Sequence, residues 1–218
     1  LLVVIIFLVP FQFKLDNLDR DASTMSGDII RGDAIKNAAM KDKKFVPFFG
    51  SSELSRFDAF HPSVLAQKYH RNYKPFLLGA PGTQSISQVM MIRSMQSTIK
   101  NKKAVFIISP QWFVRKGIKQ DYFNAYFSEL QTLDWVLSLK SITKDDRYLA
   151  NRLLSFKTVQ NKEVLVQALN RIVHNQKITK NQRESLSLKH QELKKEDQLF
   201  SGLGGISKQR KIDTAAKE

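Results

Sequence analysis

Three short apolar runs alternate with helical patterns in the first half of this chain. The runs are KKFVPFFG (43–50), KPFLLG (74–79) and KKAVFIIS (102–109), and segments of helical character at 62–70 and 84–100 separate them. Five such elements within about 65 residues are typical of a parallel sheet with crossover helices. The first half therefore predicts an α/β fold, with Pro47 an irregularity that favours a strand edge or a bulge.

The second half of the chain predicts helices and no fourth strand. Apolar residues recur at helical spacing in 123–139, 145–156, 162–174 and 182–199. Trp135, among leucines and a valine, is expected to be a packing residue, and His174 and His190 are expected on helix surfaces. The prediction is a parallel α/β sheet that is incomplete at the C-terminus and followed by a helical second half.

The two ends differ in composition from the middle. Residues 1–13 (LLVVIIFLVPFQF) carry no charge but are shorter than the about 20 residues that span a bilayer. We interpret them as a truncated transmembrane anchor, with a buried strand or a signal-peptide core as alternatives. We expect a stalk over 14–43, a partial α/β domain with a helical insertion over 44–200, and a linker or frayed tail over 201–218. On this interpretation the chain is an N-terminal fragment of a longer protein.

The composition excludes several kinds of site. The chain contains no Cys, which excludes disulfides, thiolate metal sites and a Cys nucleophile, and its four His residues form no HExxH motif. We therefore expect no metal and no cofactor. The net charge of +15 indicates a polyanionic partner, such as acidic lipid headgroups or an anionic polymer. The excess is spread along the chain without a nucleic-acid-binding motif, so no nucleic acid is expected.

Each predicted strand is followed by a turn with polar or glycine residues. The turns are Gly50–Ser51–Ser52–Glu53, then GAPGT (79–83), then Ser109–Pro110–Gln111–Trp112. Ligands of parallel α/β sheets bind beyond the carboxyl ends of the strands, so these turns predict the site. Taken singly, the serines could be helix caps, the glycines could serve only the turn, and the amide could lie on the surface.

Taken together, the three turns resemble those of the SGNH hydrolase superfamily, with serine, glycine and an amide after successive strands. More narrowly, FFGSSEL (48–54), FLLGAPGTQS (76–85), VFIISPQWF (105–113) and HPSVLAQ (61–67) are similar to the DltD family of Gram-positive bacteria. The resemblance implies a three-layer α/β/α, flavodoxin-like sheet outside the cell, tethered to the cell membrane by one N-terminal helix. It also implies a role in D-alanylation of lipoteichoic acid, a step in cell-wall biogenesis.

The resemblance implies roles for individual residues. Ser52 would be the nucleophile, and the backbone N–H groups of Ser52 and Gly79 would form the oxyanion hole, with Gln111 as a third donor where the superfamily usually has Asn. The acid and base of the family, an Asp and a His near its C-terminus, are expected outside this chain. His61 is closest to the serine turn in sequence, but we expect it to be a helix-start residue. The implied partners are lipoteichoic acid, the membrane O-acyltransferase DltB and the D-alanyl carrier system.

Two functions from different classes remain open at this stage. The first is a serine acyltransferase or esterase acting on D-alanyl esters. The second is a non-catalytic scaffold that presents the polymer or the carrier to the membrane acyltransferase. A cytosolic nucleotide-binding domain is a weaker third alternative, because the apolar N-terminus and the absence of a phosphate-loop Lys argue against it.

Overall fold

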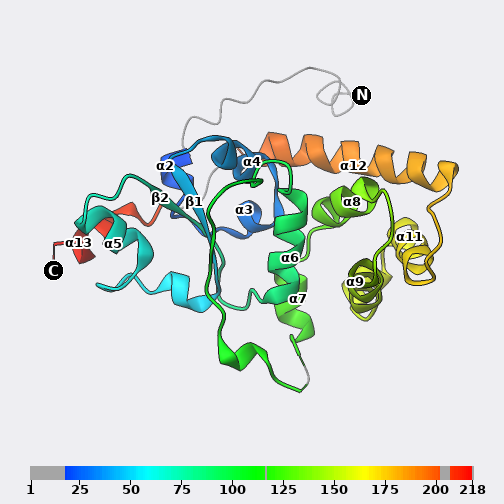
Figure 1. Ribbon diagram of the computed structural model, residues 1–218, viewed down its shortest axis with the longest axis horizontal. Helices are drawn as coiled ribbons and strands as arrows, with labels where there is room; N and C mark the ends of the chain where they lie inside the picture. Colours follow the sequence, from blue (N-terminus) through cyan, green and yellow to red (C-terminus); the bar gives the residue numbers. More distant parts are fainter. Residues whose placement is uncertain (1–17, 116, 202–206, 218) are drawn as a thin grey trace.

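A three-stranded parallel sheet forms the first half of the computed structural model, which describes residues 18–115, 117–201 and 207–217. Strands β1 (Phe45–Phe49), β2 (Lys74–Leu78) and β3 (Val105–Phe106) lie in the order β2-β1-β3. Figure 1 shows β1 and β2 side by side. The incomplete parallel α/β fold expected from the sequence is thereby confirmed. The expected anchor, residues 1–13, lies outside the described residues. Within them, no helix is both long enough and apolar enough to cross a membrane.

Alternating side chains of β1 and β2 are buried on both faces of the sheet, whereas the two residues of β3 are exposed. Phe45, Phe49, Phe76 and Leu78 pack on one face against helices α3 (Gly27–Arg31), α4 (Ala34–Lys41) and α6 (Ser85–Ser94). Phe48 and Leu77 pack on the other face, together with Leu54 of the 3-10 helix η1 (Ser52–Ser55). Helix α5 (Pro62–Lys68) packs against β2. Because β1 and β2 are covered on both faces of the sheet, nearly all of their residues are apolar.

Residues 18–43 pack onto the sheet rather than forming an extended stalk. Helix α2 (Leu18–Asp21) leads into α3 and α4, and Ile29, Ile30, Ile35 and Met40 of this region are buried in the core. Helices α3 and α4 are separate because the chain turns at Gly32 and Asp33. The apolar residues of this stretch cover the same sheet face as α6.

The second half is helical, as the sequence predicts. Its elements are α7 (Gln120–Tyr126), α8 (Glu129–Ser138), α9 (Lys144–Leu154), α10 (Lys157–Gln160), α11 (Glu163–Val173) and α12 (Lys180–Ser201), after the 3-10 helix η2 (Pro110–Trp112). Trp135 is fully buried, and its indole N–H donates to the Asp146 carboxylate at 3.1 Å. The same carboxylate accepts the Thr143 backbone N–H in a capping box that begins α9.

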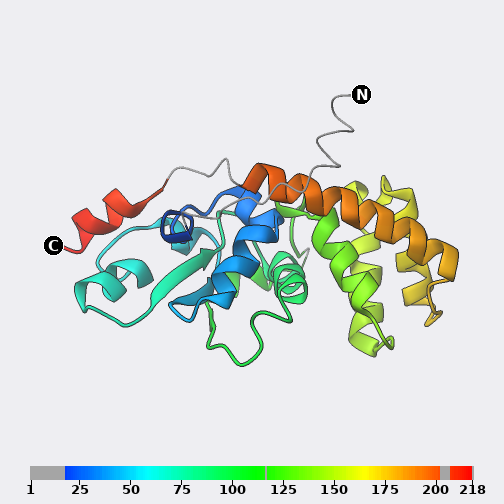
Figure 2. The ribbon, with the colours of Figure 1, turned by 90° about the horizontal axis from the view of Figure 1, so that it is seen from above.

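Polar contacts hold the long helix α12 against α4 and α8. Only Leu186 of α12 is buried, so apolar packing holds little of this helix. Asp197 accepts the backbone N–H groups of Asp33 and Ala34 at 2.9 and 2.8 Å, at the start of α4. His190 lies 2.7 Å from Asp134 of α8. Figures 1 and 2 show α12 running from the outer helices back to α4.

Segment 209–215 forms helix α13 (Gln209–Ala215), although the sequence suggested a linker or frayed tail. Ile212 and Ala215 are buried against Val64 of α5. Contacts with a distant helix stabilise this short segment, which local helix propensity alone would not do.

Candidate functional site

The three turns that follow the strands lie at one edge of the sheet. Phe49, the last residue of β1, pairs with Leu78 of β2 and with Phe106 of β3. Because all three strands are parallel, the backbones of Ser52, Gly79 and Gln111 follow the same edge. The side chain of Gln111 lies outside the described part of the structure, so its expected role as a third donor stays a prediction.

The turns after β1 and β2 are in direct contact through two glycines. A Cβ atom on Gly79 would lie 2.2 Å from the Gly50 carbonyl oxygen and 2.5 Å from its carbonyl carbon. The nearest atoms belong to the backbone, which cannot move aside as a flexible side chain could. Position 79 therefore requires glycine. The turn after β2 therefore lies directly against the serine turn after β1.

Buried polar side chains fix the two turns together. The Thr83 hydroxyl donates to the Gly50 carbonyl oxygen at 2.7 Å, and the Gln88 side-chain amide donates to the same oxygen at 3.1 Å. Thr83 is fully buried and also accepts the Ala80 N–H at 3.1 Å. Sequence reasoning missed both residues as positioning groups. The signal for Gln88 is a polar residue within the apolar helix expected over 84–100, and Thr83 is the last residue of the glycine-rich turn itself.

The structure distinguishes the two serines of the first turn. Ser51 is buried, its N–H donates to a Glu53 carboxylate oxygen at 2.5 Å, and its hydroxyl lies 3.4 Å from the Ala80 carbonyl oxygen. Ser52 begins η1 and is exposed. Ser51 therefore has a positioning role, whereas Ser52 is the hydroxyl that a ligand from solution can reach.

His61 is a structural residue and not a free base. Its Nδ1 accepts the Ser63 N–H at 3.2 Å at the start of α5, and its Nε2 lies 3.1 Å from the Leu54 carbonyl oxygen. These contacts fix the neutral tautomer with the proton on Nε2, donating to Leu54. The expectation that His61 is a helix-start residue is confirmed, and the imidazole also links η1 to α5.

Asp58 and His61 have the Asp-x-x-His spacing of a catalytic pair, which the sequence analysis overlooked. The Asp58 carboxylate, however, accepts the Phe60 N–H at 2.9 Å and makes a local turn. Its contact with His61 runs through the backbone, from the His61 N–H to the Asp58 carbonyl oxygen at 3.0 Å. Both partners are committed to local structure, so this spacing does not form a catalytic pair in this conformation.

The aromatic residues of the third turn have different environments. Trp112 is 7% exposed, which agrees with a packing role, whereas Phe113 is 75% exposed. Phe106 and Ile108 are also exposed, by 49% and 64%. The β3 side of the candidate site therefore presents apolar side chains to its surroundings, as an acyl-binding or protein-binding surface would.

Gly79→Ala should destabilise the protein by about 1–3 kcal/mol or more, because the added methyl group overlaps the Gly50 carbonyl. Gly27→Ala is the matched control, since its added Cβ meets only the flexible Arg31 side chain at 3.6 Å. Urea unfolding of both variants gives the free energies. Equal stability of the two variants would contradict the close approach of the turns.

His61 should make stability depend on pH in the acidic range. Burial lowers the pKa of His61, and the hydrogen bond to the Leu54 carbonyl and the nearby Asp58 carboxylate offset only part of this effect. A lowered pKa in the folded state means that the unfolded chain takes up a proton first, near its ordinary pKa of about 6.5. The stabilisation by His61 is thus complete above that pH and is lost as the pH falls through the folded pKa.

The test compares the wild type with His61→Asn, because Asn also caps helices well. Unfolding free energies measured from pH 7.5 to 5 should show the advantage of the wild type shrinking toward acid. Carboxylates that titrate in both proteins cancel in this difference. A difference that stays constant with pH would contradict the buried, neutral imidazole.

Comparison with known proteins identifies the family of the chain. A model of the family described as DltD protein matches residues 22–218. Proteins named Protein DltD are similar to the chain in Lacticaseibacillus rhamnosus (41% identity, 100% of this chain, 52% of the relative) and Bacillus subtilis strain 168 (30% identity, 90% of this chain, 50% of the relative). A third, from Staphylococcus aureus strain NCTC 8325 / PS 47, is 34% identical over 68% of this chain and 38% of its own length.

The chain spans about half the length of the first two of these relatives. The family match covers the sheet, the three turns and the helical half described above. On this evidence the chain belongs to the DltD family.

Proposed function

We propose that this chain is the part of a membrane-anchored, extracellular protein that carries the serine nucleophile for D-alanylation of teichoic acid. Membership of the DltD family supports the pathway, and the exposure of Ser52 after the central strand supports the chemistry. The proposed reaction class is acyl transfer or ester hydrolysis of the SGNH type. The observation that carries it is the pair of turns in which Ser51 is buried, Ser52 is exposed and Gly79 abuts Gly50.

The proposed reaction has two halves. The Ser52 hydroxyl oxygen attacks the carbonyl carbon of a D-alanyl ester or thioester while its proton passes to a base. The tetrahedral oxyanion is held by the N–H groups of Ser52 and Gly79, and its collapse expels the leaving group, which takes up a proton. In the second half, a polymer hydroxyl or water attacks the D-alanyl-serine ester and regenerates Ser52.

The base of this reaction has no candidate among the histidines of the chain. His61 uses both ring nitrogens, and His190 pairs with Asp134. His174 ends α11, and His70 follows α5. We therefore place the acid and base in a part of the longer protein beyond this chain, or on a partner.

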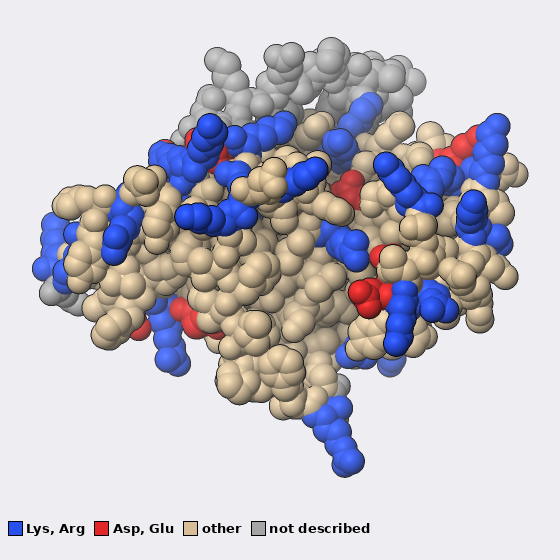
Figure 3. Space-filling view, in the orientation of Figure 1, with Lys and Arg blue, Asp and Glu red and all other residues tan. Residues whose placement is uncertain are grey.

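A scaffold function is the second candidate, and the commitment of His61 to structure favours it. In this version Ser52 forms no covalent intermediate. The chain would present lipoteichoic acid or the D-alanyl carrier to the membrane O-acyltransferase DltB. Lys and Arg side chains are spread widely over the face seen in Figure 3, which suits an extended anionic polymer.

A fluorophosphonate probe, which labels serines activated by a base, distinguishes the two candidates. We expect no labelling of the 218-residue chain, because its histidines are engaged or lie elsewhere. We expect labelling of the longer protein, lost in Ser52→Ala and retained in the matched control Ser55→Ala, which changes an exposed serine at the end of η1. Intact-protein mass spectrometry reads the adduct directly.

Each outcome distinguishes between the enzyme and the scaffold or tests the assignment of Ser52. Absence of labelling in both forms would favour the scaffold over the enzyme. Labelling that survives Ser52→Ala would contradict the assignment of the nucleophile. Labelling of the short chain at Ser52 would show that a base is present within it.

The proposed location is the outer face of the cell membrane, with a single N-terminal anchor. Its motive is the uncharged run of residues 1–13, followed at once by charged residues. An external protease added to intact protoplasts should therefore digest the domain from residue 18 onward. Complete protection of the domain until the membrane is opened would contradict this topology.

A further inference from the structure

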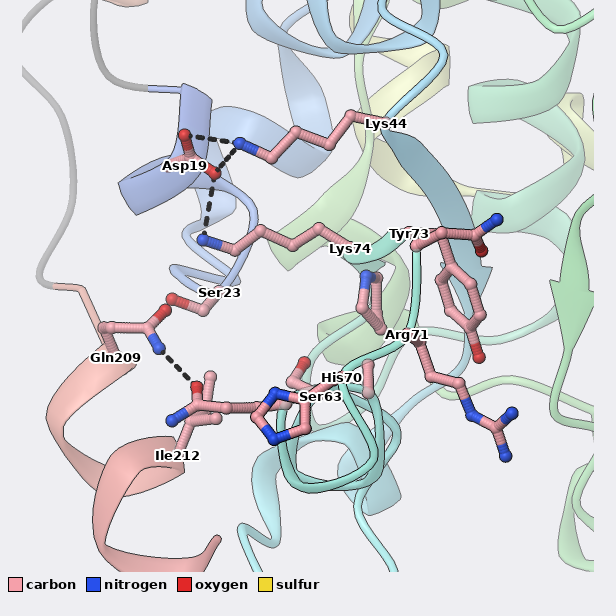
Figure 4. A pocket seen from close by; sticks show the side chains of 14 residues that line it. Asp19, Ser23, Lys44, Ser63, His70, Arg71, Tyr73, Lys74, Gln209 and Ile212 are labelled. Atoms are coloured by element: carbon pink, nitrogen blue, oxygen red, sulfur yellow. Dashed lines mark hydrogen bonds and ion pairs between the residues drawn. The ribbon is translucent and has the colours of Figure 1, made fainter.

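A cavity of about 540 Å³ lies at the opposite end of the sheet from Ser52. Its lining includes Lys44, directly before β1, and Lys74, the first residue of β2. The strand-start pocket, as we name it, is completed by Asp19 of α2, Ser63 of α5, Arg71 and Gln209 of α13 (Figure 4). Its walls come from segments far apart in the sequence, so sequence reasoning did not identify it.

Two ammonium groups meet at one carboxylate in this pocket. Lys44 Nζ lies 2.7 Å and Lys74 Nζ 3.1 Å from the same Oδ1 atom of Asp19. Two ammonium groups face one carboxylate, so these side chains carry an excess of positive charge, whereas the Arg71 guanidinium points away from them (Figure 4). The side chains of Asp19, Lys44 and Lys74 are 59%, 48% and 27% exposed. Exposed ion pairs of this kind are weak, so another anion can replace Asp19 at the lysines.

Two polar atoms of the lining lack partners among the described residues. The Ser63 hydroxyl is one, in a residue that is 7% exposed, and the Gln209 side-chain carbonyl oxygen is the other. A buried hydroxyl and a buried amide oxygen without hydrogen bonds are uncommon, and each requires an explanation. Figure 4 shows both side chains around the same space as the Lys74 ammonium group.

The unpaired groups specify the chemistry of the ligand. The lysines and the Ser63 hydroxyl are donors, which suit the oxygen atoms of a phosphate. The Gln209 oxygen is an acceptor, which suits a hydroxyl group next to that phosphate. A polyol phosphate such as glycerol phosphate provides both.

We propose that the strand-start pocket binds the phosphate of a glycerol phosphate unit, away from the candidate nucleophile. A five-residue strand spans about 15 Å, so this site and the Ser52 turn are separate. The unit occurs in anionic polymers and in phospholipid headgroups, and the chemistry of the pocket is the same for both. The inference extends the proposed function with a second site, and it does not depend on acyl transfer at Ser52.

The test titrates the full 218-residue chain, in mild detergent, with glycerophosphoglycerol and follows its amide signals by NMR. Lys44→Gln and Lys74→Gln should each weaken binding about tenfold. Asp19→Asn should strengthen it about threefold, because it removes the competing carboxylate. Lys144→Gln, which removes the same charge from the start of α9, is the matched control and should leave binding unchanged.

Ser63→Ala provides a test without any change in charge. The hydroxyl has no partner in the described structure, so its removal should leave the unfolding midpoint unchanged while weakening binding severalfold. Neutral glycerol should not bind at the concentrations used. Circular dichroism and thermal unfolding confirm that each variant is folded.

Two further probes distinguish the source of the phosphate. Displacement of glycerophosphoglycerol by poly(glycerol phosphate), without sedimentation on phosphatidylglycerol vesicles, assigns the site to a polymer. Sedimentation that is lost in Lys44→Gln and Lys74→Gln assigns it to a headgroup, and either result supports the phosphate site.

The proposal is overturned if glycerophosphoglycerol does not bind. It is also overturned if Asp19→Asn weakens binding, or if Lys144→Gln weakens it as much as Lys74→Gln does. Because the readout is binding and not labelling of Ser52, its failure leaves the proposed acyl transfer untouched, and the reverse also holds.

Discussion

The contact between the backbones of Gly50 and Gly79 determines the geometry of the candidate site. A methyl group at position 79 would overlap the Gly50 carbonyl, and that carbonyl oxygen accepts hydrogen bonds from the buried Thr83 and Gln88 side chains. The oxygen therefore belongs to a satisfied buried network, which defines one arrangement of the two turns. Ser52 is exposed in this arrangement. The preceding Ser51 is held by Glu53 through its N–H and by the Ala80 carbonyl through its hydroxyl.

A buried polar cluster at the start of α4 holds α12 in place, because only Leu186 of α12 is buried. Lys36 is fully buried, donates to the Ile30 carbonyl oxygen at 2.9 Å and lies 3.4 Å from Asp33. Burial raises the pKa of Asp33 to about 7, although the Lys36 ammonium acts in the opposite direction. Asp197 of α12 closes this cluster from outside by capping α4. Loss of one partner would leave a buried charge uncompensated and would destabilise the protein. The polar cluster therefore specifies where α12 docks.

Sequence patterns predicted what depends on local periodicity and missed what depends on distant contacts. The runs ending at Gly50 and Gly79 form the strands expected, because both faces of these strands are buried. Strand β3 is only two residues long, and its exposed Val105 and Phe106 show how little covers it in this chain. Helix α13 was not predicted, because Ile212 needs α5 to bury it. The strand-start pocket and the roles of Thr83 and Gln88 also depend on contacts between distant segments. The sequence pattern therefore did not predict them.

We propose that the turns after β1 and β2 form one oxyanion site around Ser52. A crystal structure of the longer protein carrying a phosphonate adduct tests it most directly, since the phosphonyl oxygen takes the place of the oxyanion. The account predicts that the adduct is on Ser52 and that this oxygen accepts hydrogen bonds from the N–H groups of Ser52 and Gly79. An adduct on another residue, or a phosphonyl oxygen directed away from Gly79, would contradict it.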